Sequence, residues 1–134
     1  MKNPSWRILV VDDEPAVREM LDRLLRREGY EILQAGDGQQ TLALIQQERP
    51  DLLLLDIKMP GLDGLEILRR AKALDHQLPV VMVTSDALAQ DVVAAMRAGS
   101  YDYLVKPFEP ADVLRSVQSA LTDRGLHQTV QRSP

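Results

Sequence analysis

Asp56 stands at the most informative point of the sequence, because four leucines run straight into it. The stretch Leu52–Leu55 is followed by Asp56 and, shortly after, by the turn signal Met59-Pro60-Gly61. A short apolar run with turn signals on both sides is typical of a strand that is buried on both faces. A carboxylate at the end of such a strand is costly to bury unless a positive group meets it. Asp56 is therefore the first candidate for chemistry.

Four other polar residues occupy comparable positions. They are Asp12 and Asp13 after the apolar run 8–11, Thr84 at the end of 79–84, and Lys106 at the end of 101–106. If the strands are parallel, their carboxyl ends meet at one edge of the sheet, which is where open α/β sheets bind ligands. The sequence therefore predicts that three carboxylates, a hydroxyl and an ammonium converge on one pocket.

Charge repulsion among the carboxylates limits what such a pocket can do. At an effective dielectric constant of about 20, two like charges ~4 Å apart repel by roughly 4 kcal/mol. Either one acid stays protonated or a cation enters. Hard oxygen ligands at a water-open edge suit Mg²⁺, which shares phosphate oxygens with its substrate. With Lys106 as a charge for phosphate and Thr84 as a hydroxyl donor, the set predicts a phosphoryl-transfer site with one carboxylate as nucleophile.

Hydrophobic periodicity predicts the elements that position these residues. Five apolar runs predict strands at residues 7–12, 30–35, 52–55, 79–84 and 101–106. Helical periodicity follows each strand. The first helix is predicted from the acidic start at 12–15 to Gly29, and the second around 42–45, ending near Pro50. The other three are predicted at 65–74, 88–96 and 109–122. Asp63-Gly64 is predicted to form the turn and cap before the third helix. The alternation predicts the α/β fold class, a doubly wound five-stranded parallel sheet flanked by five helices.

Length, composition and charge describe one domain. The 134 residues are 45% hydrophobic, which predicts a domain with a proper core over 1–124 and a polar tail at 125–134 that frays. The chain has no cysteine, so disulfide and thiol chemistry are excluded. The net charge of −4 does not provide the positive surface that nucleic-acid binding requires. No apolar run has the character of a signal peptide or the length of a membrane span. We therefore expect a soluble, cytoplasmic domain without direct nucleic-acid or membrane partners.

At this point the chain resembles a known family, the receiver domains of two-component response regulators. The matching segments are Leu9-Val10-Val11-Asp12-Asp13-Glu14, Asp56-Ile57-Lys58-Met59-Pro60-Gly61-Leu62-Asp63-Gly64, Val83-Thr84-Ser85 and Asp102-Tyr103-Leu104-Val105-Lys106-Pro107-Phe108. The resemblance covers about the first 122 residues of the chain. The resemblance implies the flavodoxin-like strand order 2-1-3-4-5. It also implies a phosphorylation-dependent switch that catalyses its own phosphorylation and dephosphorylation without being a conventional enzyme.

The resemblance implies a role for each acid of the predicted pocket. Asp56 would be the phosphoacceptor, attacking the phosphohistidine of a sensor histidine kinase or a phosphotransfer protein to give an acyl phosphate. Asp13 and Asp56 would bind Mg²⁺ through their side chains, and Asp12 largely through water. The backbone carbonyl of Lys58 would complete the protein ligands.

The remaining implied roles concern the response to phosphorylation. Lys106 would pair with a phosphoryl oxygen, and its bond to Pro107 is expected to be cis. Thr84 would swing toward the phosphoryl group, and Tyr103 would rotate inward. The face formed by residues 88–96, 101–106 and 109–122 would then change its affinity for a downstream effector domain or protein, and would be the surface for a homodimer. Kinase choice is expected to depend on the exposed face of the first helix, for example on Arg18 and Asp22.

Two positions are particular to this chain. Lys58 follows Asp56 by two residues, and Asp86 follows Thr84 by two. In receivers these positions flank the route of water to the acyl phosphate, so we hypothesise that Lys58 and Asp86 pair across the mouth of the site and slow hydrolysis. An exposed pair contributes roughly 0–1 kcal/mol, so the effect should be modest.

Three alternatives compete with the switch. A metal-dependent phosphatase with an aspartyl nucleophile would carry a second aspartate two residues after the first, where this chain has Lys58. A degenerate receiver would act only as a protein-binding module, but the intact set of acids, hydroxyl and lysine argues against it. A DNA-binding regulator is disfavoured because the residues after Thr122 are too few for an effector domain. The output, the cognate kinase and the oligomeric state stay open.

Overall fold

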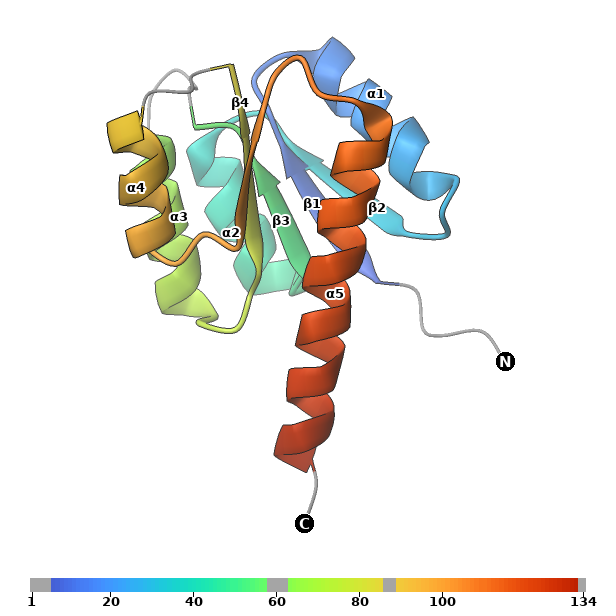
Figure 1. Ribbon diagram of the computed structural model, residues 1–134, viewed down its shortest axis with the longest axis vertical. Helices are drawn as coiled ribbons and strands as arrows, with labels where there is room; N and C mark the ends of the chain where they lie inside the picture. Colours follow the sequence, from blue (N-terminus) through green and yellow to red (C-terminus); the bar gives the residue numbers. More distant parts are fainter. Residues whose placement is uncertain (1–5, 58–62, 86–88, 133–134) are drawn as a thin grey trace.

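The computed structural model describes residues 6–57, 63–85 and 89–132 (Figure 1). In these ranges strands and helices alternate. The strands are β1 (Arg7–Val11), β2 (Glu31–Ala35), β3 (Leu52–Leu55), β4 (Val80–Thr84) and β5 (Asp102–Val105). The helices are α1 (Pro15–Arg26), α2 (Gly38–Glu48), α3 (Gly64–Leu74), α4 (Ala89–Arg97) and α5 (Pro110–Arg132). All strand pairs are parallel and the order is β2-β1-β3-β4-β5, so the predicted fold class and strand order are confirmed.

The central strand β3 is buried on both faces, as its run of leucines predicts. Its four residues are at most 1% exposed. Leu53 and Leu55 pack into one hydrophobic cluster, while Leu52 and Leu54 pack into a second cluster on the other face of the sheet. In register, Leu54 lies between Val10 of β1 and Val81 of β4. This alternation fixes the register of β3, because a shift by one residue would exchange the two faces.

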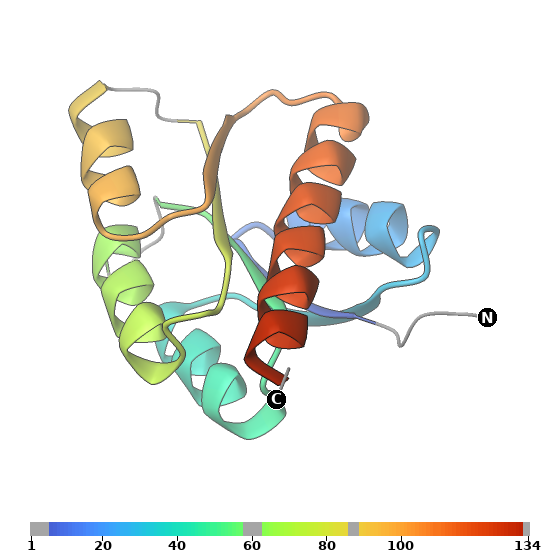
Figure 2. The same ribbon diagram turned by 60° about the horizontal axis from the view of Figure 1, so that its bottom comes forward.

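Helices cover the sheet in two layers (Figures 1 and 2). The cluster on one face contains Ile45 of α2, Ile67 of α3 and Ala95 of α4. The cluster on the other face contains Leu25 of α1 and Val117 of α5. Both layers leave the carboxyl ends of the strands uncovered by helix, which is the edge where the predicted site residues lie (Figure 1).

The turn before α3 holds the end of β3 close to that helix. Asp63 caps α3 by accepting a hydrogen bond from the Leu65 N–H at 3.2 Å, and the Gly64 N–H donates to the Ile57 carbonyl. A Cβ atom on Gly64 would lie 2.4 Å from the Ile57 Cα, so only glycine fits. The predicted turn and cap at Asp63-Gly64 are therefore confirmed.

Helix α5 is longer than its hydrophobic pattern predicts. The predicted helix end at Thr122 is wrong, because α5 continues to Arg132 (Figure 1), while the fraying of the tail stays a prediction. Contacts near residue 124 hold the helix at this point: Tyr101 donates to the Asp123 carboxylate at 2.6 Å, and Arg124 donates to the Gln77 carbonyl at 2.9 Å. A helix that is already nucleated can propagate through the following residues without apolar periodicity. The predicted domain limit at residue 124 stays a prediction.

Along the described parts of the chain, none of the helices has both the length and the apolar character that a membrane crossing needs.

Candidate functional site

The predicted strand-end residues meet at the carboxyl edge of the sheet. Asp12 follows β1 and Asp56 follows β3, and the Asp56 N–H donates to the Val11 carbonyl at 3.0 Å. Carboxylate oxygens of Asp12, Asp13 and Asp56 all lie within 4.8 Å of one another. Asp12 and Asp56 are only 2% and 5% exposed, whereas Asp13 faces solvent. The parallel topology therefore brings together acids that are 44 residues apart in the sequence (56 − 12).

Lys106 supplies the positive charge that the two buried acids require. Its Nζ atom lies 2.7 Å from Asp12 Oδ2 and 3.3 Å from Asp56 Oδ2. Burial alone would lower the pKa of Lys106, but the hydrogen bond to Asp12 and the charges of Asp56 and Asp12 raise the pKa above its ordinary value. The side chain is therefore an ammonium at neutral pH. The Lys106–Pro107 peptide bond is cis, as predicted.

Asp12 has less freedom to bind a ligand than the other two acids. Its Oδ1 atom accepts a hydrogen bond from the Glu14 N–H at 2.9 Å, at the start of α1, and its Oδ2 atom accepts from Lys106. Both oxygens are therefore engaged within the protein. That Asp12 would act on a metal largely through water, and Asp13 and Asp56 through their side chains, stays a prediction.

The donor set fits Mg²⁺. Three carboxylates provide hard oxygen ligands, and exposed Asp13 keeps the cluster open to the water molecules that Mg²⁺ retains. One ammonium against three carboxylates leaves an excess of negative charge among the described residues. Asp56, Asp13 and, through water, Asp12 are the residues that would hold the ion. Lys58, the fourth predicted ligand, lies outside the described residues, as does its hypothesised partner Asp86.

Thr84 and Tyr103 lie on neighbouring strands beside this cluster. Thr84 is fully buried at the end of β4, and its carbonyl accepts a hydrogen bond from the Lys106 N–H at 2.7 Å. In register, Tyr103 of β5 pairs with Met82, two residues before Thr84, so the Thr84 and Tyr103 side chains share one face of the sheet. Tyr103 is half-buried against the hydrophobic cluster beneath α3 and α4. The structure thus places both predicted switch residues on neighbouring strands and on the same face of the sheet.

Arg18 contributes to the site in a way that the sequence pattern does not reveal. Its Nη1 atom donates to the Asp12 carbonyl at 2.6 Å, and its Nε atom donates to Gln34 of β2 at 3.3 Å. Asp22 also binds Gln34, accepting from its side-chain amide at 2.6 Å. The prediction that kinase choice depends on the exposed face of the first helix, for example on Arg18 and Asp22, stays a prediction, and both side chains also make hydrogen bonds within the protein. A residue on the polar face of a helix gives no sequence signal for such contacts.

Comparisons with known proteins agree with this geometry. The profile of the response regulator receiver domain matches residues 8–118. The DNA-binding response regulator MtrA of Mycolicibacterium smegmatis is 43% identical over 121 residues, which are 90% of this chain and 53% of that protein. The transcriptional regulatory protein PrrA of Mycobacterium tuberculosis is 41% identical over 90% of this chain and 52% of its own length. This chain thus spans about half the length of these curated relatives.

A solved structure carries the same fold over nearly all of its length. The CheY-like response regulator receiver domain protein from Methanospirillum hungatei JF-1 aligns with a TM-score of 0.90 and 34% identity. The alignment covers 92% of this chain and 99% of that one. The profile match, the sequence identity to these relatives and the shared strand topology together show that this chain belongs to the response regulator receiver domain family.

Proposed function

We propose that this receiver domain is a phosphorylation-activated switch whose phosphoacceptor is Asp56. The observation that carries the proposal is the convergence of Asp56 with Asp12, Asp13 and Lys106 at one edge of the sheet. A structural role alone does not call for three clustered carboxylates, because their repulsion destabilises the fold. A site that receives a phosphoryl group with Mg²⁺ does call for them.

In the proposed reaction, the phosphoryl group comes from a phosphohistidine of a sensor histidine kinase or a phosphotransfer protein. A carboxylate oxygen of Asp56 attacks phosphorus, the phosphorus–nitrogen bond breaks, and the imidazole nitrogen leaves with its electron pair and takes up a proton. Bound Mg²⁺ would neutralise charge on the phosphoryl oxygens. Lys106 is already 3.3 Å from Asp56, so its ammonium needs little movement to pair with a phosphoryl oxygen. Hydrolysis of the acyl phosphate, catalysed by the same residues, returns Asp56 to its carboxylate.

The proposed output follows from the charge that phosphorylation adds. A phosphoryl group brings roughly −1.5 to −2 charges and three acceptor oxygens to the site. We propose that the Thr84 hydroxyl moves to donate to it and that Tyr103 turns inward on the same face of the sheet. The surface of α4, β5 and α5 then changes its affinity for an effector domain, a separate protein or a second receiver. Val93, Met96 and Val105 are exposed apolar residues on this surface that such a partner could cover.

Covalent labelling tests this proposal. Incubation with phosphoramidate and Mg²⁺ should add one phosphoryl group, measured by intact mass, and EDTA should prevent the addition. Asp56→Asn should abolish the labelling. Asp51→Asn is a matched control, because Asp51 precedes β3 at the opposite edge of the sheet and should leave the labelling in place. Labelling that persists in Asp56→Asn would refute the assignment of the phosphoacceptor.

A further inference from the structure

An arginine outside the carboxylate cluster holds the backbone that carries two of its acids. Arg18 of α1 is half-buried, and its Nη1 atom donates to the Asp12 carbonyl at 2.6 Å. That carbonyl belongs to the peptide unit between Asp12 and Asp13. Because a peptide unit is planar, the direction of its carbonyl also sets the direction of the Asp13 N–H, and this limits where the Asp13 side chain can point. Arg18 therefore acts on Asp13 through the backbone.

Asp13 depends on this backbone more than the other acids do. The carboxylate of Asp12 is bonded to the Glu14 N–H and to Lys106. The Asp13 side chain is exposed and makes no hydrogen bond or ion pair with the residues that the structure describes. Its carboxylate nevertheless lies within 4.8 Å of those of Asp12 and Asp56, although their repulsion favours a more distant position. The orientation of the peptide unit before Asp13 thus decides whether its carboxylate stays in the cluster.

The guanidinium of Arg18 is itself fixed by groups around β2. Its Nε atom donates to the side-chain oxygen of Gln34 at 3.3 Å. Asp22 accepts from the side-chain amide of Gln34 at 2.6 Å, so the oxygen of that amide is left to face Arg18. A Cβ atom on Gly36 would lie only 3.0 Å from Arg18 Nη1, so the glycine leaves room for the guanidinium. The planar fork of an arginine can hold a side chain and a backbone carbonyl at once.

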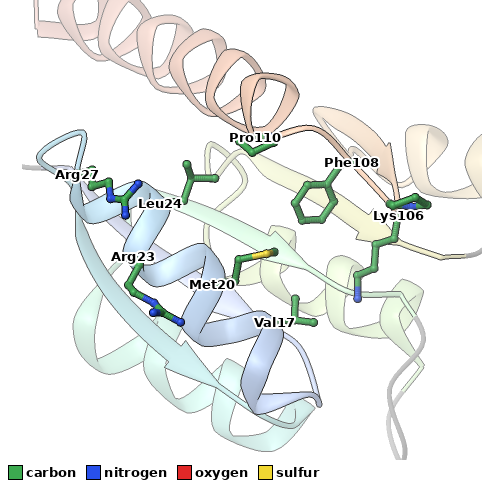
Figure 3. Close-up of a pocket in the computed structure, with 9 residues that line it drawn as sticks. Val17, Met20, Arg23, Leu24, Arg27, Lys106, Phe108 and Pro110 are labelled. Atoms are coloured by element: carbon green, nitrogen blue, oxygen red, sulfur yellow. The ribbon is translucent and has the colours of Figure 1, made fainter.

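The start of α1 is also held on its other flank. Figure 3 shows Val17 on the side of α1 that faces Lys106 and Phe108, and all three residues line one groove. Consecutive residues of a helix are about 100° apart around its axis, so Arg18 reaches β2 while Val17 faces the segment after β5. Contacts on both flanks hold the start of α1 against the sheet. Arg18 therefore reaches the Asp12 carbonyl from a fixed base.

We propose that Arg18 is a positioning residue for Mg²⁺ binding. It holds the peptide unit between Asp12 and Asp13 so that the Asp13 carboxylate meets the ion together with Asp56. This inference deepens the proposed function and rests on it, because it concerns the Mg²⁺ that phosphoryl transfer would use. Arg18 does not touch the ion and acts through the backbone of its ligand.

Two simpler explanations of Arg18 predict different results. If Arg18 only fastens α1 to β2, its loss lowers stability and leaves the affinity for Mg²⁺ unchanged. If Arg18 only supplies a positive charge beside the acids, its loss tightens Mg²⁺ binding, because like charges repel. If Arg18 positions Asp13, its loss weakens Mg²⁺ binding, as is usual for residues that orient metal ligands. The sign of the change in Kd therefore distinguishes the three roles.

Titration with Mg²⁺ alone, followed by amide NMR shifts, measures this Kd. Arg18→Ala should raise the Kd about tenfold. Arg18→Lys keeps the charge but lacks the fork that binds Gln34 and the carbonyl together, so it should recover only part of the affinity. Arg124→Met is the matched control, because Arg124 also joins distant elements but at the opposite edge of the sheet, where it pairs with Asp75 at 3.3 Å. This control should bind Mg²⁺ as wild type does.

Gly36→Ala tests the same contact without removing the arginine. The added methyl group would displace the Arg18 guanidinium by a few tenths of an ångström, and we expect the Kd for Mg²⁺ to rise about threefold. In the Arg18→Ala background, Gly36→Ala should cause no further rise, because the group that it displaces is gone. Phosphoramidate labelling gives a second readout. The labelling deficit of Arg18→Ala should shrink as the Mg²⁺ concentration is raised.

The outcomes separate this inference from the proposed function. If wild type binds Mg²⁺ but Arg18→Ala and Gly36→Ala bind it as tightly or more tightly, the positioning role is wrong. If Arg18→Ala does not fold, as judged by circular dichroism, the Kd of Gly36→Ala decides alone. A wild-type chain that binds no Mg²⁺ overturns both proposals. A wild-type chain that binds Mg²⁺ but is not labelled by phosphoramidate overturns the proposed function, and the Kd values still decide the role of Arg18.

Discussion

The two edges of the sheet both carry charged side chains, but the charges are balanced differently at each edge. At the amino edge, Arg7 pairs with Glu48 at 2.6 Å, and Arg124 pairs with Asp75 at 3.3 Å and lies 3.9 Å from Asp51. At the carboxyl edge, the ammonium of Lys106 faces a cluster of three carboxylates, counting only the residues that the structure describes. Charges that hold a fold together are paired with each other. The excess at the carboxyl edge therefore indicates a ligand that completes the site.

The amino edge shows what a structural ion network looks like in this chain. Asp51 also accepts a hydrogen bond from the Arg7 N–H at 2.8 Å, and Asp75 accepts one from the Gln77 N–H at 3.1 Å. These acids therefore have backbone as well as side-chain partners. The cation of the network is less completely bonded than the acids, because the buried Nε atom of Arg124 lacks a hydrogen-bond acceptor within the described residues. The network joins β1, β3, α3 and α5, and fixes where α5 leaves the domain.

The largest expected effect comes from the two lysines, one near each edge. Lys106→Met should slow phosphoramidate labelling by about 10²-fold or more, because the phosphoryl group loses a preorganised positive charge. Lys72→Met is the matched control, since Lys72 donates to the Leu78 carbonyl far from Asp56, and it should be labelled at the wild-type rate. Equal rates in the two variants would show that the lysine beside Asp56 has no special role. Circular dichroism of both variants establishes that they are folded.

Breaking the amino-edge network should reduce stability and leave the chemistry intact. Arg124→Met deprives Asp75 and Asp51 of their cation. We expect the free energy of unfolding to fall by about 1–3 kcal/mol. This loss is smaller than that for fully buried ion pairs, because both acids are partly exposed. Urea unfolding measures the loss. Arg115→Met, which removes an exposed pair with Asp112, should cost about 0.5 kcal/mol or less. An Arg124 variant as stable as the Arg115 variant would refute the structural role of the network.

The smallest expected effect is the opposite pH response of the two lysines. Contacts with Asp12 and Asp56 outweigh the effect of burial and raise the pKa of Lys106 in the folded state. The folded state therefore holds this proton more tightly than the unfolded state does, and stability falls as the pH rises above about 10.4. Burial lowers the pKa of Lys72, so the unfolded state binds more protons and stability rises with pH just below about 10.4. Unfolding free energies of wild type, Lys106→Met and Lys72→Met over this pH range test the two signs. Parallel pH profiles for all three proteins would contradict the assignment.

Much of the fold and of the site is predictable from local signals. Short apolar runs predict the strands, and polar residues at their ends predict the meeting of Asp12, Asp56 and Lys106. What the sequence leaves hidden depends on contacts between distant surface residues. Arg124 and Arg18 sit in polar segments, where a solvated arginine and one bound to a neighbouring element look the same.

The length of α5 shows a second limit of the pattern. Its residues after Thr122 lack apolar periodicity, so the pattern predicts an end where the helix continues. Apolar periodicity predicts a helix only where one of its faces is apolar, so a helical segment without such a face gives the pattern no signal.

Stability measured with and without Mg²⁺ tests most directly whether the carboxyl edge is an incomplete metal site. In EDTA, Asp13→Asn should be more stable than wild type by about 0.5–1 kcal/mol, because it relieves repulsion in the cluster at an exposed position. At a Mg²⁺ concentration ten times its Kd, wild type should gain about 1.4 kcal/mol and the variant much less. A variant that is less stable than wild type in EDTA, or one that gains as much from Mg²⁺, would contradict the account.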